Sequence, residues 1–223
     1  MNETTKDLLR SLKATASSRF NASKRLSHVD SRLTALTAFT SAFIIALTIL
    51  PKFIELPHGG QNWLELTTIA LSIIILASSL LQNSSNFAVK SELFHRSALE
   101  IQQLKRELQF KSSNLSEAEF DSISKKYNDI LQIYSINHED VDFYRHQVEY
   151  HKDYTLGWVE KVSKRAQIWC AYMYPSVILA TLTVFLVALT FAAICWPVAQ
   201  PPYANTPPSQ SESSNLKQLA PAQ

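Results

Sequence analysis

The densest group of titratable side chains lies in the segment INHEDVDFYRH, residues 136–146. On a helix, Glu139, Asp142 and His146 would share one face, and carboxylates with an imidazole are ligands that a divalent metal ion accepts. The alternative is structural: Asn137 would be the N-cap of a helix that begins one residue later, with acids in its first turn favoured by the helix dipole. We favour the cap, because no second set of ligands stands out elsewhere. The candidates for a hinge, or for sensing a ligand or partner, are Asn137, His138, Glu139, Asp142 and His146.

No other group of residues supports catalysis or a cofactor. The sequence has three glycines, too few for a phosphate-binding loop or a dinucleotide-binding turn. The two cysteines, Cys170 and Cys195, would be about 37 Å apart on one helix and could not pair within the chain. Basic pairs alternate with acids, so we do not expect direct nucleic-acid binding. We expect a protein that is not an enzyme; a membrane-bound hydrolase using His138 and Glu139 is the catalytic alternative.

Hydroxyl side chains recur at helical spacing inside two apolar stretches. Each set follows offsets that keep its members on one helix face. Such a face has to meet protein or water, because polar groups in hydrocarbon are costly unless they are satisfied. Two interpretations stay open: small Ser and Thr let membrane helices pack closely, or the faces of several copies line a water-filled path. The candidates are Thr34, Thr37, Ser41 and Thr48 in the first stretch and Glu65, Thr68, Ser72 and Ser79 in the second.

Three stretches are long and apolar enough to cross a membrane, which takes about 20 residues. The sequence predicts spans at about 33–54, 63–82 and 170–196. Proline and glycine between the first two predict a short hairpin. The third stretch carries a sparser hydroxyl series, Ser176, Thr183 and Thr190. It could instead be a re-entrant or interfacial segment.

The distribution of Lys and Arg predicts the orientation in the membrane. Residues 1–32 carry seven and residues 83–165 carry twelve, whereas the loop 51–62 and the tail after residue 196 carry one each. We therefore expect the N-terminus inside the cell and the C-terminus outside. The basic residues just before the third span would sit at the inner membrane surface and attract anionic lipid headgroups. They are Lys161, Lys164 and Arg165.

Between the second and third spans the sequence predicts two cytoplasmic helices. An apolar residue recurs every seven positions at Phe87, Phe94, Ile101 and Leu108, which indicates a helical stripe. No breaker separates this stripe from the second span, so one helix is predicted from Asn62 to about Lys111. Ser116 and Glu119 fit a capping box at the start of the next helix. The two helices are predicted to form an antiparallel hairpin, or alternatively to pair as a coiled coil between subunits.

Together these patterns predict an all-α integral membrane protein with a two-span hairpin, a third C-terminal span and a cytoplasmic helical hairpin. Its predicted segments are an N-terminal amphipathic cytoplasmic helix at 1–32, the membrane hairpin at 33–82, the cytoplasmic helical region at 83–165, the third span at 166–196 and a disordered, proline-rich tail at 197–223.

The sequence resembles the SLATT family of membrane proteins. The resemblance rests on the two spans with their tight hairpin, on the runs KSELFHRSALEIQQLKREL and YNDILQIYSINHEDVDFYR, and on the third apolar segment. It covers about residues 5–195. The second run most resembles the SLATT branch encoded beside bacterial reverse transcriptases, whose Asn-His…Asp pattern would match Asn137, His138 and Asp142.

The resemblance implies a bacterial inner-membrane effector that assembles as a homo-oligomer in membrane lipid. Its expected function is a pore-forming or membrane-disrupting effector of antiphage abortive infection, activated through a cytoplasmic partner or signal. The implied partners are nucleotide-signal synthases, nucleotide-sensing domains or a reverse transcriptase. The alternative is a non-pore membrane anchor or scaffold that recruits a reverse transcriptase or sensor. The third span departs from the two-span core of the family, which leaves open which helices would form a pore.

Overall fold

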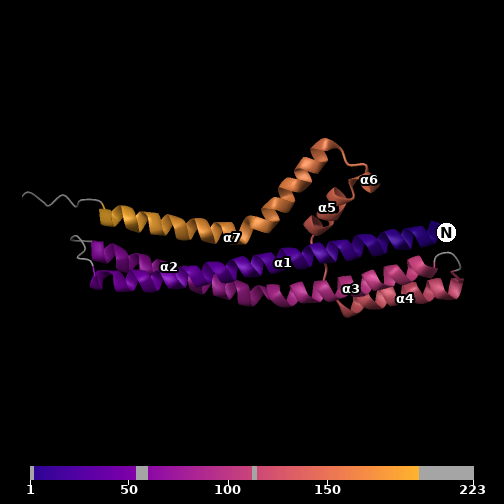
Figure 1. Cartoon of the computed structure of the whole chain (residues 1–223), viewed down its shortest axis with the longest axis horizontal. Helices are drawn as coiled ribbons and strands as arrows, with labels where there is room; N and C mark the ends of the chain where they lie inside the picture. Colours follow the sequence, from indigo (N-terminus) through magenta and orange to yellow (C-terminus); the bar gives the residue numbers. More distant parts are fainter. Residues whose placement is uncertain (1–2, 54–59, 112–114, 196–223) are drawn as a thin grey trace, which may run out of the picture.

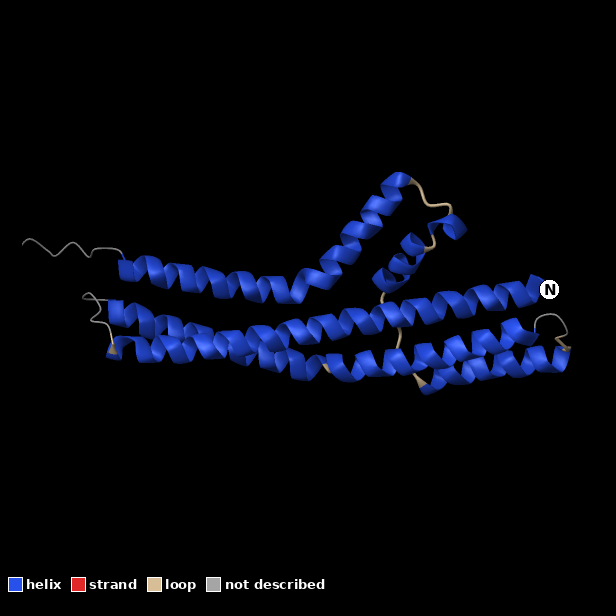
Figure 2. Cartoon of the chain, viewed as in Figure 1, coloured by secondary structure: helices blue, strands red, loops and turns tan. Residues whose placement is uncertain are grey.

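A computed structural model describes residues 3–53, 60–111 and 115–195, and within these ranges all regular structure is helical (Figure 2). The all-α class predicted from the sequence is confirmed. Most of the predicted hairpin loop and the predicted disordered tail lie outside the described residues. The elements are α1 (Glu3–Ile49), a short 3-10 helix η1 (Leu50–Lys52), α2 (Gly60–Ser85), α3 (Phe87–Lys111), α4 (Glu117–Ile133), α5 (Asp140–Glu149), α6 (His151–Tyr154) and α7 (Trp158–Cys195).

The longest element is α1, whose 47 residues form a rod of about 70 Å. Figure 1 shows α2 and then α3 running back beside α1, and α4 folding back along α3. The other side of α1 carries α5 and the second half of α7. The single helix α1 therefore extends from the polar part of the molecule into its membrane part.

Two helices are long and apolar enough to cross a membrane, and a third qualifies when the two halves of α7 are counted as one span. The first two comprise the second half of α1 and α2, as the sequence predicted. The axis of α7 bends by 55° between Trp158–Tyr174 and Ser176–Ala192. Pro175 lies at the bend, and a proline inside a helix removes a backbone hydrogen bond there. The predicted third span, 166–196, thus begins inside the straight first half of α7.

The helix predicted from Asn62 to Lys111 corresponds to one long helical segment, Gly60–Lys111, with a single-residue break at Asn86. This residue has a φ of 49°, in the left-handed region, and it separates α2 from α3. Asparagine tolerates this conformation better than most residues, because its short amide side chain bonds locally. The sequence contained no glycine or proline at this point, so the interruption escaped prediction.

The polar half of the molecule is a bundle of three helices, α1, α3 and α4. Leu12 of α1 and Leu104 and Leu108 of α3 are buried together with Ile123 of α4. The heptad stripe of α3 is thus confirmed as a buried face, and the capping box of Ser116 and Glu119 is present. The predicted two-helix hairpin was incomplete, because α1 supplies the third wall. Because α1 and α4 cover this stripe within one chain, the stripe is not free to pair between subunits, as the coiled-coil alternative requires.

Arg19 of α1 is a buried cation in this bundle, and its burial is energetically unfavourable. Its side chain is 4% exposed, its Nη1 nitrogen has no hydrogen-bond partner, and it forms no ion pair within the described residues. Burial lowers the pKa of the guanidinium, with the nearby Tyr127 and Tyr134 acting in the opposite sense. A buried charge without a partner opposes folding.

We therefore expect Arg19→Met to stabilise the protein by about 1–3 kcal/mol, the usual cost of an unsatisfied buried polar group. Thermal unfolding in detergent measures this, with Arg106→Met as the control on an exposed basic residue of α3. A lower melting temperature for Arg19→Met would mean that the guanidinium is satisfied in the fold.

Candidate functional site

The eight predicted polar positions in the first two spans lie next to the packed faces of their helices. Leu33, Thr40 and Leu47 of α1 are buried, and Thr34, Ser41 and Thr48 each follow one of them. On α2 the positions Glu65, Thr68, Ser72 and Ser79 each follow a buried residue in the same way. We call the eight positions together the hydroxyl face; they are exposed or half-buried.

The two series project to the same side of the α1–α2 hairpin. Each residue of a helix is rotated by 100° about the axis from the residue before it. In two antiparallel helices, the residues that directly follow the contact residues therefore point to the same side of the pair. The other side is covered by the second half of α7, where Thr190 shares a hydrogen bond with Thr67 and Leu186 packs against the α1–α2 core. The hydroxyl face is therefore the side of the hairpin opposite α7.

Most hydroxyls of this face bond within their own helix. Ser41 donates to the carbonyl oxygen of Thr37 at 2.8 Å, and Ser72 donates to that of Thr68 at 2.7 Å. Thr34, Thr48 and Thr68 also donate to backbone carbonyls three or four residues earlier. Two members also reach the other span: Thr37 lies 3.1 Å from the hydroxyl of Ser78, and Thr34 accepts a hydrogen bond from Gln82 at 2.7 Å. Ser41, Thr48, Thr68 and Ser72 therefore use their protons within their own helices, and their lone pairs remain for an outside partner.

Packing inside the chain also buries three hydroxyls that the sequence analysis did not single out in the first two spans. Thr40, Thr67 and Ser78 are almost fully buried. In α7 the buried members are Ser176 and Thr190, both from the sparser series noted in the third span. Burial alone separates the packing hydroxyls from the outward ones, and spacing along one helix could not assign them.

The second candidate region is the docking site of α5 on α1. Arg25 of α1 donates to both carboxylate oxygens of Asp142, each at 3.0 Å. Both side chains are buried, and Asn21 donates to the backbone oxygen of Asp142 at 3.1 Å. Glu139 lies 3.0 Å from the same guanidinium but is largely exposed. Burial lowers the pKa of Arg25, but the bonds and charges of Asp142 and Glu139 outweigh this and raise it.

The docking site corrects the predicted cap. The helix begins at Asp140 with Glu139 as its N-cap, so Asn137 does not cap it; Asn137 is exposed instead. His138 is half-buried and close to the backbone of Glu139. Within the described residues, no three His, Cys, Asp or Glu side chains are grouped closely enough to hold a metal ion. The carboxylate of Asp142 is committed to Arg25.

His146 is buried against aromatic rings. It is 2% exposed, and the rings of Phe143, Tyr150 and Tyr154 lie around it. Burial lowers the pKa of His146, and the charge of Lys13 on α1 adds to this effect. Glu149 and Asp153 oppose it more weakly. The neutral imidazole is therefore the form that fits the docked α5.

A cavity of about 300 Å³ adjoins the docking site and involves two of the predicted sensing residues. Asn137 and Glu139 line it together with Arg25. Lys90 of α3 adds a second cation, and the remaining walls are apolar. Arg25 and its exposed partner Glu139 thus both line the same cavity.

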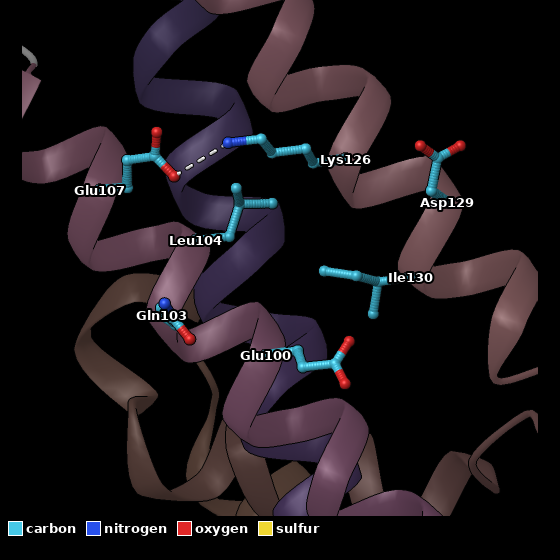
Figure 3. Close-up of a pocket in the computed structure, with 7 residues that line it drawn as sticks. All are labelled: Glu100, Gln103, Leu104, Glu107, Lys126, Asp129 and Ile130. Carbon is cyan, nitrogen blue, oxygen red and sulfur yellow. Dashed lines mark hydrogen bonds and ion pairs between the residues drawn. The ribbon is translucent and has the colours of Figure 1, made fainter.

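A second cavity, of about 330 Å³, lies between α3 and α4 (Figure 3). Three acids, Glu100, Glu107 and Asp129, surround it, and Lys126 is 3.4 Å from Glu107. None of the predicted sensing residues lines it. The α5 docking site, rather than this groove, therefore joins the sequence candidates to the rest of the fold.

Sequence reasoning missed the partners of α5. Arg25 and Asn21 lie in the first helix, and Arg145 on α5 donates to the hydroxyl of Tyr172 on α7. These residues are more than 25 positions from their partners. The acids of the 136–146 segment indicated that a cation would pair with them, but the sequence did not identify which cation.

We expect Arg25→Met to destabilise the protein by about 3–5 kcal/mol, because it leaves the buried Asp142 carboxylate unpaired. The double variant Arg25→Met/Asp142→Leu should recover most of this loss, since removing both charges together is often neutral. Glu139→Gln is the control and should cost less than about 1 kcal/mol. Chemical unfolding in detergent measures these three variants, the single variant Asp142→Leu and the wild type; a loss in the double variant equal to the sum of the two single losses would contradict the coupling.

Acid should weaken the docking of α5 through His146. Below pH of about 6.5 the unfolded chain binds a proton that the buried imidazole does not, so stability falls as pH drops from there toward the lowered pKa. Above that window the contribution is complete. Melting temperatures between pH 7.5 and 5.5 should fall less for His146→Phe than for the wild type. His151→Gln, on an exposed histidine, should leave the wild-type slope unchanged; equal slopes for wild type and His146→Phe would refute the assignment.

The comparison with known proteins agrees with this architecture. Residues 1–188 match the family model of the SMODS and SLOG-associating 2TM effector domain family 5. No curated protein and no solved structure matches the chain. The match covers both spans, the three-helix bundle and the α5 docking site. The chain belongs to this SLATT effector family, and it is a membrane-associated effector.

Proposed function

We propose that the protein is a pore-forming effector of bacterial antiphage defence, in which several copies assemble around their hydroxyl faces. The observation that carries this proposal is the position of the hydroxyl face. It lies on one side of the two-span hairpin, on both helices, with α7 on the other side. Contact with lipid would not favour such a face, because hydrocarbon offers its outward lone pairs no hydrogen-bond donors.

One chain cannot enclose water with two or three helices, so the proposed pore is a homo-oligomer in the inner membrane. Each copy would turn its hydroxyl face inward and its α7 outward toward lipid. Glu65, which is exposed, would then lie near the external mouth of the path and favour cations. The orientation follows the positive-inside distribution, with a cytoplasmic N-terminus.

Activation is proposed to act through the α5 docking site. A cytoplasmic signal or partner that competes for Arg25 would free α5 from α1, and α1 continues without a break into the first span. The cavity beside Asn137 gives such a ligand access to Glu139 and Arg25. The resemblance names the class of system, nucleotide signalling or a neighbouring reverse transcriptase, that would supply the signal during abortive infection.

The test is ion leakage from liposomes that hold the purified full chain, with and without the proteins encoded beside it. Leakage that appears only with the trigger supports a gated pore. A stable complex without leakage in any state would overturn the pore and identify a membrane anchor that recruits its partner.

Cysteine labelling tests which face lines the path. In a background of Cys170→Ser and Cys195→Ala, we expect Ser72→Cys to react with a charged, water-soluble thiol reagent in the leaking state. The neighbouring Ile73→Cys, which is 100° around the helix, should not. Ser41→Cys and Phe39→Cys form the matched pair on α1. Equal reactivity within each pair, despite leakage, would assign the path to other surfaces.

Conservative removal of the hydroxyls gives an independent measure. The combined variant Ser41→Ala, Thr48→Val, Thr68→Val and Ser72→Ala keeps side-chain size and should lower leakage by roughly tenfold, because an apolar lining sheds water. The control carries Phe39→Leu, Ile69→Val and Ile73→Val on the exposed apolar faces. If only the control variant lost leakage, the hydroxyl face would not be the lining.

A further inference from the structure

The first half of α7, Trp158–Tyr174, leaves the membrane bundle at an angle. We call it the α7 arm. Its axis makes an angle of 55° with that of Ser176–Ala192, and Figure 1 shows it rising away from α1 with α5 beneath it. Helices that pass straight from a span into a bundle do not diverge in this way. The arm therefore has one side for α5 and another that faces away from the protein.

The inner side of the arm is held by polar bonds to α5 and α1. Lys164 donates to Oε1 of Gln147 at 2.6 Å. Tyr172 accepts a hydrogen bond from Arg145 and donates to the backbone oxygen of Asn21 at 3.4 Å. These contacts hold the arm against α5 and α1.

The outer side of the arm is apolar and uncovered within the described residues. Trp158, Val162 and Trp169 are spaced by four and seven positions and so share one face. Their exposed fractions are 78%, 48% and 63%, and Val159 beside them is 73% exposed. Two tryptophans on a free helix face are typical of a membrane–water interface, where an indole ring has one apolar and one polar environment.

The edge of this outer face is positively charged. Arg165 is exposed and Lys161 half-buried, and neither forms an ion pair within the described residues. The acid of the arm, Glu160, is already bound to Lys164 at 2.7 Å. The face therefore presents two unpaired cations beside two indole rings.

We propose that the outer face of the α7 arm binds the anionic headgroup surface of the cytoplasmic leaflet. Trp158 and Trp169 would be buried at the level of the headgroups, and Lys161 and Arg165 would pair with acidic lipids. Continuity of the chain argues for this occupant, because the span at Ser176 begins about 10 Å beyond Trp169 along the helix. The charge of the face argues for anionic lipid in particular.

The angle of the arm fits this surface. Membrane helices are tilted by about 20° on average, and such a tilt in the direction of the bend would bring the arm to about 15° from the membrane plane. This attachment does not require a pore, so it stands or falls independently of leakage.

The experiment measures the environment of Trp158 and Trp169 in the full chain. Trp63→Phe and Trp196→Phe leave these two as the only tryptophans. The protein is placed in phosphatidylcholine bilayers with or without phosphatidylglycerol. We expect a headgroup-attached spin label to quench the arm, and aqueous iodide to quench it less, when phosphatidylglycerol is present.

A charge variant separates lipid from other occupants. Lys161→Gln/Arg165→Gln should weaken attachment by about 30-fold in the equilibrium constant, or about 1 kcal/mol for each charge, and should remove the phosphatidylglycerol dependence. The control, Lys105→Gln/Arg106→Gln, makes the same charge change on α3 and should change nothing.

Three results would overturn the proposal. Quenching by iodide alone would place the face in water. Protection from both quenchers in every bilayer would mean that protein, such as a second copy, covers it. Equal spin-label quenching with and without phosphatidylglycerol would remove the role given to Lys161 and Arg165.

Discussion

The positions of α5 and of the α7 arm depend on one buried ion pair, Arg25 with Asp142. It fixes α5 on α1, and α5 in turn holds the arm of α7 through Arg145 and Gln147. A buried pair of this kind adds little net stability, because taking both charges out of water offsets their attraction. Its effect is on position: a half-inserted α5 would leave two charges buried without partners. In the proposed activation, the docked and released states of α5 would therefore be separate.

The same pair lies close to the membrane along a continuous helix. Arg25 and Leu33 are eight positions apart on α1, about 12 Å, and no residue between them interrupts the helix. The connection from the second span back to the three-helix bundle differs from this, because Asn86, in a left-handed conformation, separates α2 from α3. In the proposed activation, a change at the docking site would reach the first span along one unbroken helix. The route from docking site to hydroxyl face runs through α1.

Sequence periodicity identified the features that depend on local spacing. The spans, the stripe from Phe94 to Leu108 and the capping box all follow from apolar period or short-range bonds, and all are present. A helix at 1–32 was predicted, but its packing as the third wall of the bundle was not, because it is rich in Ala and Ser and buries Arg19 and Arg25, which sequence reasoning places on a surface. The cap at Asn137 failed for a related reason: Glu139 and Asp142 are oriented by a cation over 110 positions away. Such tertiary pairing leaves no local pattern.

The hydroxyl face illustrates what helical geometry can and cannot determine. Spacing showed that the hydroxyls share a face, but only the packed residues show that both series point to one side. A hydroxyl that donates to its own helix, as Ser41 and Ser72 do, offers only lone pairs outward. The positions of this face carry no Lys or Arg, and their one charge is the carboxylate of Glu65. A path built from several such faces would present acceptors throughout, and acceptors suit water and cations better than anions. The chemistry of the face therefore favours a cation-conducting path within the proposed oligomer.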